Sequence, residues 1–262
     1  NDLLFQFIQY IERQVVLFDA IEDAGFAYVN NMHGRGTIRN IKEEAASKQK
    51  QEALMEYLNR FRVRIVLTAH PTQFYPGSVL GIINELSSAI QEDDLSRIKI
   101  LLSQLGKTRF YNKQKPSPLD EAVSLIWYLE NVFYHSASTI YNYLDKNIFE
   151  SQPIENSIFD FGFWPGGDRD GNPYVTPDIT RKTAHALRFS ILRNYYRDLR
   201  KLKRKITFDG VDETLSRLTD SLLEELFYPK QNPVVTSDGL LSDLTNVHNI
   251  LIQDHNGIYE AE

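Results

Sequence analysis

Residues 63–72 read Val-Arg-Ile-Val-Leu-Thr-Ala-His-Pro-Thr. The run up to Thr68 is short, is rich in β-branched residues and stops just before Pro71, which predicts a buried β-strand. His70 follows this strand and lies between Thr68 and Thr72. Parallel α/β folds place catalytic side chains at the carboxyl ends of their strands. His70 is therefore a candidate for proton transfer, while the spacing alone leaves open a structural histidine at a strand end.

A second strand is predicted over Ser157–Phe163, and a glycine-rich segment continues from it. Residues 163–173 read Phe-Trp-Pro-Gly-Gly-Asp-Arg-Asp-Gly-Asn-Pro. The glycines allow tight turns and close approach of the backbone to a ligand. Arg169 offers a planar fork suited to carboxylate or phosphate, and Asp168 and Asp170 can hold that arginine in place. The alternative is a tight turn in which the aspartates cap backbone amides.

Most of the remaining chain is predicted to be helical, because apolar residues recur at spacings of three and four. We expect helices over residues 3–24, 40–61, 77–106 (as a pair around an acidic turn), 118–149, 177–206, 211–227 and 241–253. The inward face of the 118–149 helix is predicted to hold Leu119, Val123, Ile126, Phe133, Ala137, Ile140, Leu144 and Ile148. The fold class is therefore mainly α with a few β-strands. Two strands do not make a stable sheet alone, so we expect the sheet to be completed by further strands.

Two helix starts carry clear capping patterns. In Lys-Pro-Ser-Pro-Leu-Asp-Glu-Ala at residues 115–122, Ser117 suits the N-cap, Pro118 the first helical position and Asp120 the capping box. Thr176 precedes the next long helix in the same way. Helix initiation explains both segments, so neither is a first choice for chemistry.

The helix predicted over 177–206 is strongly basic. Between Arg181 and Lys205 it carries ten Lys or Arg side chains and one carboxylate, Asp198. We favour a solvated basic face on a helix whose opposite face packs in the core. The predicted core stripe consists of Leu187, Ile191, Tyr195, Leu199 and Leu202. Binding of a polyanion such as nucleic acid is the weaker alternative.

Composition excludes several classes of function. The chain has 262 residues, which corresponds to one large domain or two small ones. It has no cysteine, so disulfides, cysteine nucleophiles and thiolate metal sites are excluded. The net charge of −6 is the wrong sign for a general nucleic-acid binder. We therefore expect no nucleic-acid partner. No uncharged apolar run is long enough for a membrane span, so we expect no membrane partner either.

Three motifs occur in one order: Val-Leu-Thr-Ala-His-Pro-Thr at 66–72, Pro-Ser-Pro-Leu-Asp-Glu-Ala at 116–122 and Gly-Gly-Asp-Arg-Asp-Gly-Asn-Pro at 166–173. Together they resemble phosphoenolpyruvate carboxylase. The resemblance implies a fold that is mainly α with a few parallel β-strands, as a partial (β/α)8-type, TIM-like barrel embedded in helices. It makes the chain the N-terminal part of such an enzyme, with residues 1–61 as a helical N-terminal region and 62–262 as the start of the barrel and its helices.

The resemblance also implies a reaction. Family members convert phosphoenolpyruvate and bicarbonate to oxaloacetate and phosphate, through carboxyphosphate and enolpyruvate. His70 would be the proton-transfer histidine, and Thr72, Asp168, Arg169 and Asp170 would bind substrate. Mg²⁺ or Mn²⁺ is required, with its ligands in a later part of the enzyme. The complete enzyme is expected to be a cytoplasmic homotetramer, and this chain alone is expected to be inactive.

The sequence departs from the family pattern in two places. Gln73 stands where the family usually has glutamate, and Thr-Arg-Phe-Tyr-Asn at residues 108–112 replaces the usual Thr-Asp-Glu-Ile-Arg. Both departures suggest a divergent branch. A non-catalytic helical module, derived from a carboxylase and binding an anion or a partner, is the alternative reading of the whole chain.

Overall fold

The computed structural model describes residues 2–68, 75–110, 116–150, 152, 154, 157–207, 210–228 and 235–255, the last four of these by backbone alone. The chain forms two compact units. Unit 1 combines residues 1–116 with 143–162, and unit 2 combines 117–142 with 163–262. The described part is mainly helical and has one small sheet of two strands, as the sequence predicts. No helix among the described residues is long and apolar enough to cross a membrane.

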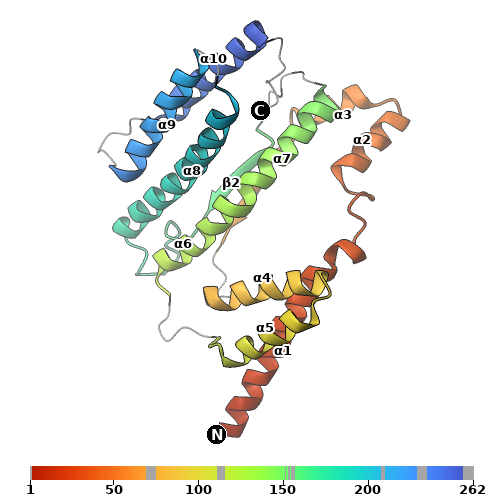
Figure 1. Ribbon diagram of the computed structural model, residues 1–262, viewed down its shortest axis with the longest axis vertical. Coiled ribbons are helices and arrows are strands. Elements are labelled where there is room, and N and C mark those ends of the chain that lie inside the picture. The colour runs from red at the N-terminus through yellow and green to blue at the C-terminus, as the bar shows by residue number, and fades with distance from the viewer. Residues whose placement is uncertain are drawn as a thin grey trace. The chain divides into compact units, whose positions relative to one another are not determined.

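In unit 1, the helix α1 (Asp2–Val29) packs against α4 (Gly77–Gln91), which packs in turn against α5 (Leu95–Lys107). Figure 1 shows α1 in red beside these two helices in yellow. Their shared core is apolar and consists of Val16, Ala20, Val79, Ile82, Ile83, Leu86, Ala89, Leu101, Leu105 and Phe110. The helix pair predicted around the acidic turn at 92–94 is confirmed, with Asp94 as the N-cap of α5.

The single helix predicted over 40–61 is wrong. The structure has α2 (Ile38–Ser47) and α3 (Gln51–Leu58), separated at Gln49. Gln49 has φ of 54°, a left-handed conformation that an α-helix cannot continue through. The composition of Glu, Lys, Gln and Ala favours helix on both sides and carries no sign of this break.

The strands β1 (Val63–Leu67) and β2 (Phe159–Phe163) lie side by side and run parallel. Both predicted strands are thus confirmed. Arg64 and Asp160 form an ion pair across them at 2.5 Å. The prediction that the first strand is buried is right only at Leu67, because half-buried and exposed positions alternate before it and Val66 is 41% exposed. In the described part the sheet has only two strands, so each strand is paired along one edge only.

In unit 2, the helix α8 (Pro177–Lys205) packs against both α6 (Pro118–Tyr128) and α9 (Val211–Phe227), and α10 (Ser237–His255) packs against α9. These helices confirm the predicted ones within a few residues at their ends. Their core is formed mainly by Leu192, Leu199, Ile206, Val211, Leu215, Leu218, Leu222, Leu240, Val247 and Leu251.

The predicted inward faces are only partly right. The 118–149 helix is continuous, but π-helical turns η1 (Leu129–Phe133) and η2 (Asp145–Phe149) flank α7 (Tyr134–Leu144). A π-turn widens the helix and shifts the face that follows it. Val123 is 53% exposed, against prediction, while Glu130 is buried.

On α8, the predicted stripe is right at Leu199, which is buried, and wrong at Ile191, which is 37% exposed. The polar residues Ser190 and Asn194 are buried in its place. Ser190 donates to the Glu130 carboxylate, and Asn194 donates to the Glu130 backbone carbonyl. Polar pairing therefore helps to decide which face of α8 points inward.

Candidate functional site

The glycine-rich turn, defined here as residues 164–174, leads from β2 towards α8. The backbone N–H groups of Gly167 and Asp168 both donate to the carbonyl of Trp164, at 3.0 and 2.9 Å. The N–H of Asn172 donates to the carbonyl of Arg169 at 2.5 Å. The segment is therefore two successive tight turns, with Arg169 at their junction. α8 then begins from Thr176, whose hydroxyl accepts from the N–H of Ile179, as its predicted capping pattern requires.

Gly166 fixes this turn against α8. Its φ is +72°, in the left-handed region where side chains are strained. A Cβ at this position would lie 2.1 Å from the Thr183 hydroxyl oxygen, and Thr183 is buried. Gly171 has the same φ, but nothing lies within 4 Å of the position its Cβ would take. Gly166 is therefore required both by its left-handed backbone and by the lack of room for a side chain. Gly171 is required by its left-handed backbone alone.

Two polar side chains of the turn, Asp168 and Asn172, cap its backbone. The Asp168 Oδ1 atom accepts a hydrogen bond from the N–H of Asp170 at 3.3 Å. Asn172 does the same for the N–H of Tyr174 at 3.1 Å. The capping interpretation is therefore confirmed for Asp168. Within the described residues neither aspartate forms an ion pair with Arg169, so the idea that they hold its guanidinium finds no support there.

Arg169 itself is exposed, as are Asp168 and Asp170. Its guanidinium is presented to solvent on a turn that backbone hydrogen bonds close, an arrangement able to bind an anion without first breaking an internal ion pair. His70, Thr72 and Gln73 lie outside the described residues. Their predicted roles therefore stay predictions.

The two strands that precede these segments in the sequence are neighbours in the sheet. Since β1 and β2 run parallel, the chain leaves both strands at the same edge of the sheet. His70 comes three residues after the end of β1, and Arg169 comes six residues after the end of β2. Side chains that follow parallel strands at one edge are the usual source of active sites in α/β folds.

The motif at 116–122 is structural, as expected. The Ser117 hydroxyl accepts from the N–H of Asp120, and the Asp120 carboxylate accepts from the N–H of Ser117 at 2.9 Å. Pro118 occupies the first turn. Hydrogen bonds from the hydroxyl and then the backbone of Ser117 hold the pKa of Asp120 below its usual value. The residues form a complete capping box and need no chemical role.

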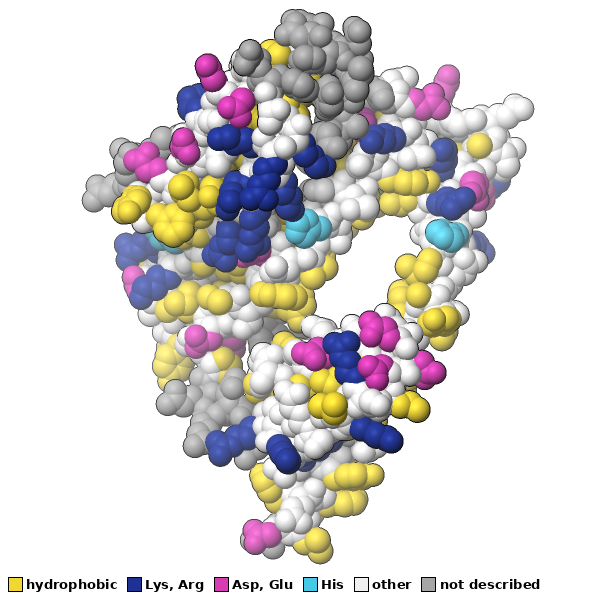
Figure 2. All heavy atoms as spheres, in the orientation of Figure 1, with side chains coloured by type: hydrophobic (Ala, Val, Ile, Leu, Met, Phe, Trp, Pro, Cys, Tyr) yellow, Lys and Arg dark blue, Asp and Glu magenta, His cyan; other side chains and the backbone are white. Residues whose placement is uncertain are grey.

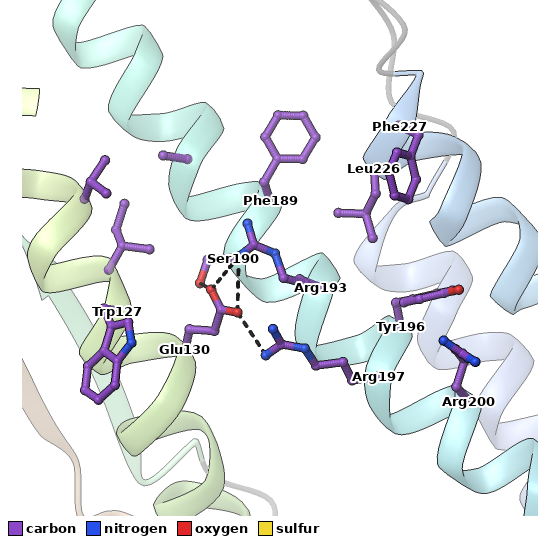
Figure 3. Close-up of a pocket in the computed structure, with 13 residues that line it drawn as sticks. Trp127, Glu130, Phe189, Ser190, Arg193, Tyr196, Arg197, Arg200, Leu226 and Phe227 are labelled. Carbon is purple, nitrogen blue, oxygen red and sulfur yellow. Dashed lines mark hydrogen bonds and ion pairs between the residues drawn. The ribbon is translucent and has the colours of Figure 1, made fainter. Parts of the chain in front are cut away.

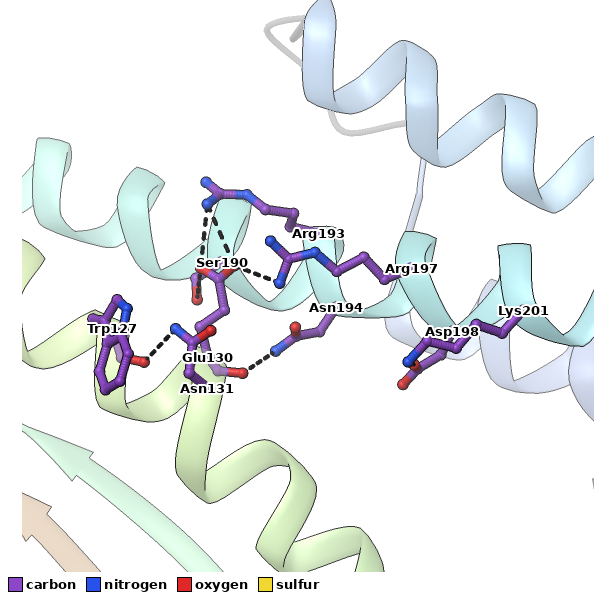
Figure 4. A network of polar contacts seen from close by, with 9 residues as sticks. All are labelled: Trp127, Glu130, Asn131, Ser190, Arg193, Asn194, Arg197, Asp198 and Lys201. Atoms are coloured by element: carbon purple, nitrogen blue, oxygen red, sulfur yellow. Dashed lines mark hydrogen bonds and ion pairs between the residues drawn. The ribbon is translucent and has the colours of Figure 1, made fainter. Parts of the chain in front are cut away.

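A second polar cluster was missed by the sequence prediction. Glu130 in η1 is buried, and it pairs with Arg197 at 2.9 Å and with Arg193 at 3.3 Å, both from α8. Figure 4 shows these guanidinium groups converging on its carboxylate. Ser190 donates to the same carboxylate at 3.3 Å, and Asn194 donates to the backbone carbonyl of Glu130 at 3.0 Å. The sequence gives one indication that Glu130 is buried: it follows the apolar residues Ala122 and Ile126 at the same spacing of four.

This cluster forms part of the floor of an open pocket of about 820 Å³ within unit 2, which we call the arginine-lined groove. Figure 3 shows Trp127 on one side and Leu226 and Phe227 on the other, with α8 between them. Figure 2 shows Lys and Arg side chains gathered over α8, next to apolar ones. The groove is lined by Val123, Ile126, Trp127, Glu130, Ala186, Phe189, Ser190, Arg193, Tyr196, Arg197, Arg200, Leu226 and Phe227.

The described residues do not form a metal site. No three His, Asp or Glu side chains among them come together in a way that could hold a metal ion. The residues present in the described part therefore do not fit Mg²⁺ or Mn²⁺, and no chemical step below is assigned to a metal.

Comparison with known proteins gives consistent matches. A family model described as phosphoenolpyruvate carboxylase matches residues 12–239. Phosphoenolpyruvate carboxylase of Aeromonas salmonicida is 28% identical over 192 residues, which cover 67% of this chain and 22% of that protein. Phosphoenolpyruvate carboxylase 4 of Arabidopsis thaliana is 31% identical over 179 residues, covering 62% and 17%. The Shewanella oneidensis enzyme is 25% identical over 222 residues, covering 79% and 25%. The matched region thus spans about a fifth of the length of these relatives.

Proposed function

Because this chain belongs to the phosphoenolpyruvate carboxylase family, a family of lyases, we propose that it forms part of an enzyme that joins bicarbonate to phosphoenolpyruvate, giving oxaloacetate and phosphate. The matched region covers about a fifth of the relatives, so the proposal concerns a longer parent protein. The exposed apolar side chains of α1, among them Leu3, Phe7 and Phe18, support it. Such a surface is unusual unless another part of a protein covers it.

The observation that carries the proposal is the shared edge of the two parallel strands. The segments that follow them contain His70 and Arg169, a proton carrier and an anion-binding side chain. An enzyme that handles phosphoenolpyruvate, bicarbonate and carboxyphosphate needs fixed cationic donors, because every one of these species is an anion. Arg169 supplies such a donor from a closed turn.

His70 accepts the carboxyl proton of carboxyphosphate as carbon dioxide and phosphate separate, and the enolate of pyruvate then attacks carbon dioxide. Neutral imidazole suits this step, since its ordinary pKa lies near physiological pH. Thr72 and Arg169 bind the phosphate or carboxylate groups. Asp168 supports substrate binding by capping a backbone N–H of the turn, and Asp170 binds substrate from the same turn.

The remaining parts of the proposal concern the parent protein. It would complete the two-stranded sheet into a TIM-like barrel embedded in helices, with residues 1–61 as a helical N-terminal region and 62–262 as the start of the barrel. It would be a cytoplasmic tetramer, and its Mg²⁺ or Mn²⁺ ligands would lie outside this chain. The isolated chain would lack carboxylase activity because the rest of the catalytic shell is absent.

The test is His70→Asn in the parent protein. We expect carboxylation to fall by about a hundredfold or more, within the range that loss of a general acid–base residue causes, while phosphoenolpyruvate still binds. His185→Asn, an exposed histidine on α8, is the matched control and should keep full activity. Near-normal turnover of the His70 variant would overturn the assignment. Phosphoenolpyruvate binding by a wild-type parent that never turns over would favour the non-catalytic module.

A further inference from the structure

The arginine-lined groove carries more positive charge than its internal pairing uses. Arg193 and Arg197 share the carboxylate of Glu130, the one acidic side chain that lines the groove. Arg200 pairs with no carboxylate among the described residues, and its guanidinium lies 5.7 Å from the centre of the Tyr196 ring. Three arginines and one buried carboxylate therefore line the groove, which leaves it cationic.

The three arginines are held in place before any ligand arrives. They lie at positions 193, 197 and 200, on one face of α8. Two of them are fixed by Glu130 and the third by stacking on Tyr196. Arg193 and Arg197 nevertheless keep about half of their side-chain surface exposed, at 50% and 49%. Their positions are set by the buried carboxylate, and each guanidinium has further N–H groups that can donate to a second acceptor.

The walls of the groove are apolar and exposed. Trp127 is 52% exposed and Phe227 is 70% exposed, which is costly for large aromatic side chains that cover nothing. They lie on opposite sides of α8, as Figure 3 shows. A ligand that matches both the arginines and the apolar walls has a planar or acyl apolar body and a strongly negative head.

We propose that the arginine-lined groove binds a phosphate monoester with an apolar body, its phosphate on Arg193, Arg197 and Arg200 and its body against the aromatic walls. A phosphate monoester carries close to two negative charges at neutral pH and three acceptor oxygens. Three arginines and one glutamate leave two positive charges unbalanced in the groove. A phosphate monoester therefore matches this charge better than a carboxylate, which carries one negative charge. The site is separate from the glycine-rich turn and does not depend on the carboxylase activity.

The chain provides its own reporters for a test. It has two tryptophans, Trp127 in the groove and Trp164 in the glycine-rich turn. Their indole N–H signals in a ¹H–¹⁵N spectrum can be assigned with Trp164→Phe. Phenyl phosphate is the probe, and inorganic phosphate and phenol supply the charge and the ring separately. We expect phenyl phosphate to shift the Trp127 signal saturably, and to bind about tenfold more tightly than either comparison compound.

Two variants separate a built site from a merely basic surface. Arg200→Gln should weaken phenyl phosphate about fivefold or more, the usual effect of losing one charge-assisted hydrogen bond. It leaves the Glu130 pairs intact. Arg181→Gln removes the same charge from the first turns of the same helix and should change the affinity less than twofold. Phe227→Ser, at an exposed position, should reduce the preference for phenyl phosphate over inorganic phosphate. Unchanged helical circular dichroism checks that each variant is folded.

Four results would overturn the proposal. They are a Trp127 signal that does not move, movement of the Trp164 signal alone, equal affinities for phenyl and inorganic phosphate, and equal weakening by the Arg200 and Arg181 variants. The second result would place anion binding at the glycine-rich turn. The last would show that the general field of α8 attracts the probe, and binding should then fall steeply with salt.

Discussion

The glycine-rich turn and the arginine-lined groove both present arginine side chains, but different parts of the chain hold them. In the turn, positive-φ glycines and short backbone hydrogen bonds set the position of Arg169. In the groove, the buried carboxylate of Glu130 positions Arg193 and Arg197 from a helix about 60 residues away in sequence. The turn should therefore be sensitive to changes of backbone freedom, and the groove to changes of side-chain charge.

The largest effect is expected in the turn. Gly166→Ala should lower the free energy of unfolding by about 3 kcal/mol, because a left-handed alanine is strained and its methyl group overlaps Thr183. Gly171→Ala has the same φ but open space around it, so it should cost only about 1 kcal/mol. Urea unfolding of both variants measures the difference. Equal losses would show that the contact with Thr183 does not constrain the turn.

The second effect concerns the groove. Glu130→Gln keeps the size of the side chain and removes its charge, so both arginines lose a charge-assisted partner. We expect a loss of about 2 kcal/mol. Glu43→Gln is the control, since Glu43 forms an exposed ion pair with Arg39 and should cost at most about 0.5 kcal/mol. If the two variants cost the same, the buried carboxylate does not organise the groove.

A third effect lies beside the groove. The Tyr134 hydroxyl donates to Asp198 on α8 at 2.9 Å, so Tyr134→Phe should cost about 1 kcal/mol at neutral pH. Burial, and then the Asp198 carboxylate, raise the pKa of Tyr134 in the folded chain. The stabilisation is therefore complete below the ordinary tyrosine pKa of about 10 and is lost as pH rises above it.

The corresponding measurement compares the wild type with Tyr134→Phe by urea unfolding at neutral and alkaline pH. The difference between their free energies of unfolding should become smaller above about pH 10. Tyr174→Phe, which removes an exposed hydroxyl, is the control and should leave stability unchanged at neutral pH. A free-energy difference that grows with pH would contradict the raised pKa of Tyr134.

The smallest effect returns to the turn. Asp168→Ala removes an exposed acceptor for one backbone N–H and should cost about 0.5 kcal/mol. Asp168→Asn retains an acceptor oxygen and should be neutral. A loss shared by both variants would show that the charge of Asp168 matters to the fold, and hence that backbone capping is not its main task.

The sequence predicts most elements of this fold because their signals are local. The caps at Ser117 and Thr176, the β-branched strand and the helical spacing all depend on neighbouring residues. The glycine-rich turn is local in the same sense, so its capping aspartate could be anticipated. Local signals also mislead at Gln49, whose left-handed backbone ends a helix although the residues on both sides favour helix.

The groove could not be predicted in this way. Burying Glu130 requires partners from α8 and a π-turn that shifts the helix face, and neither follows from the residues around position 130. Regular periodicity instead favours Val123 as an inward residue, and the structure exposes it. The meeting of distant polar side chains is a tertiary property, whereas the recognised motifs are segments of continuous sequence.

The central claim is that the glycine-rich turn presents Arg169 to an anionic substrate of a carboxylase. Steady-state carboxylation by the parent protein with Arg169→Gln, beside Arg181→Gln on an exposed part of α8, tests it most directly. We predict that kcat/KM for phosphoenolpyruvate falls by about a hundredfold or more in the first variant and stays within about twofold of wild type in the second. Equal kcat/KM values for Arg169→Gln and the wild type would contradict the account.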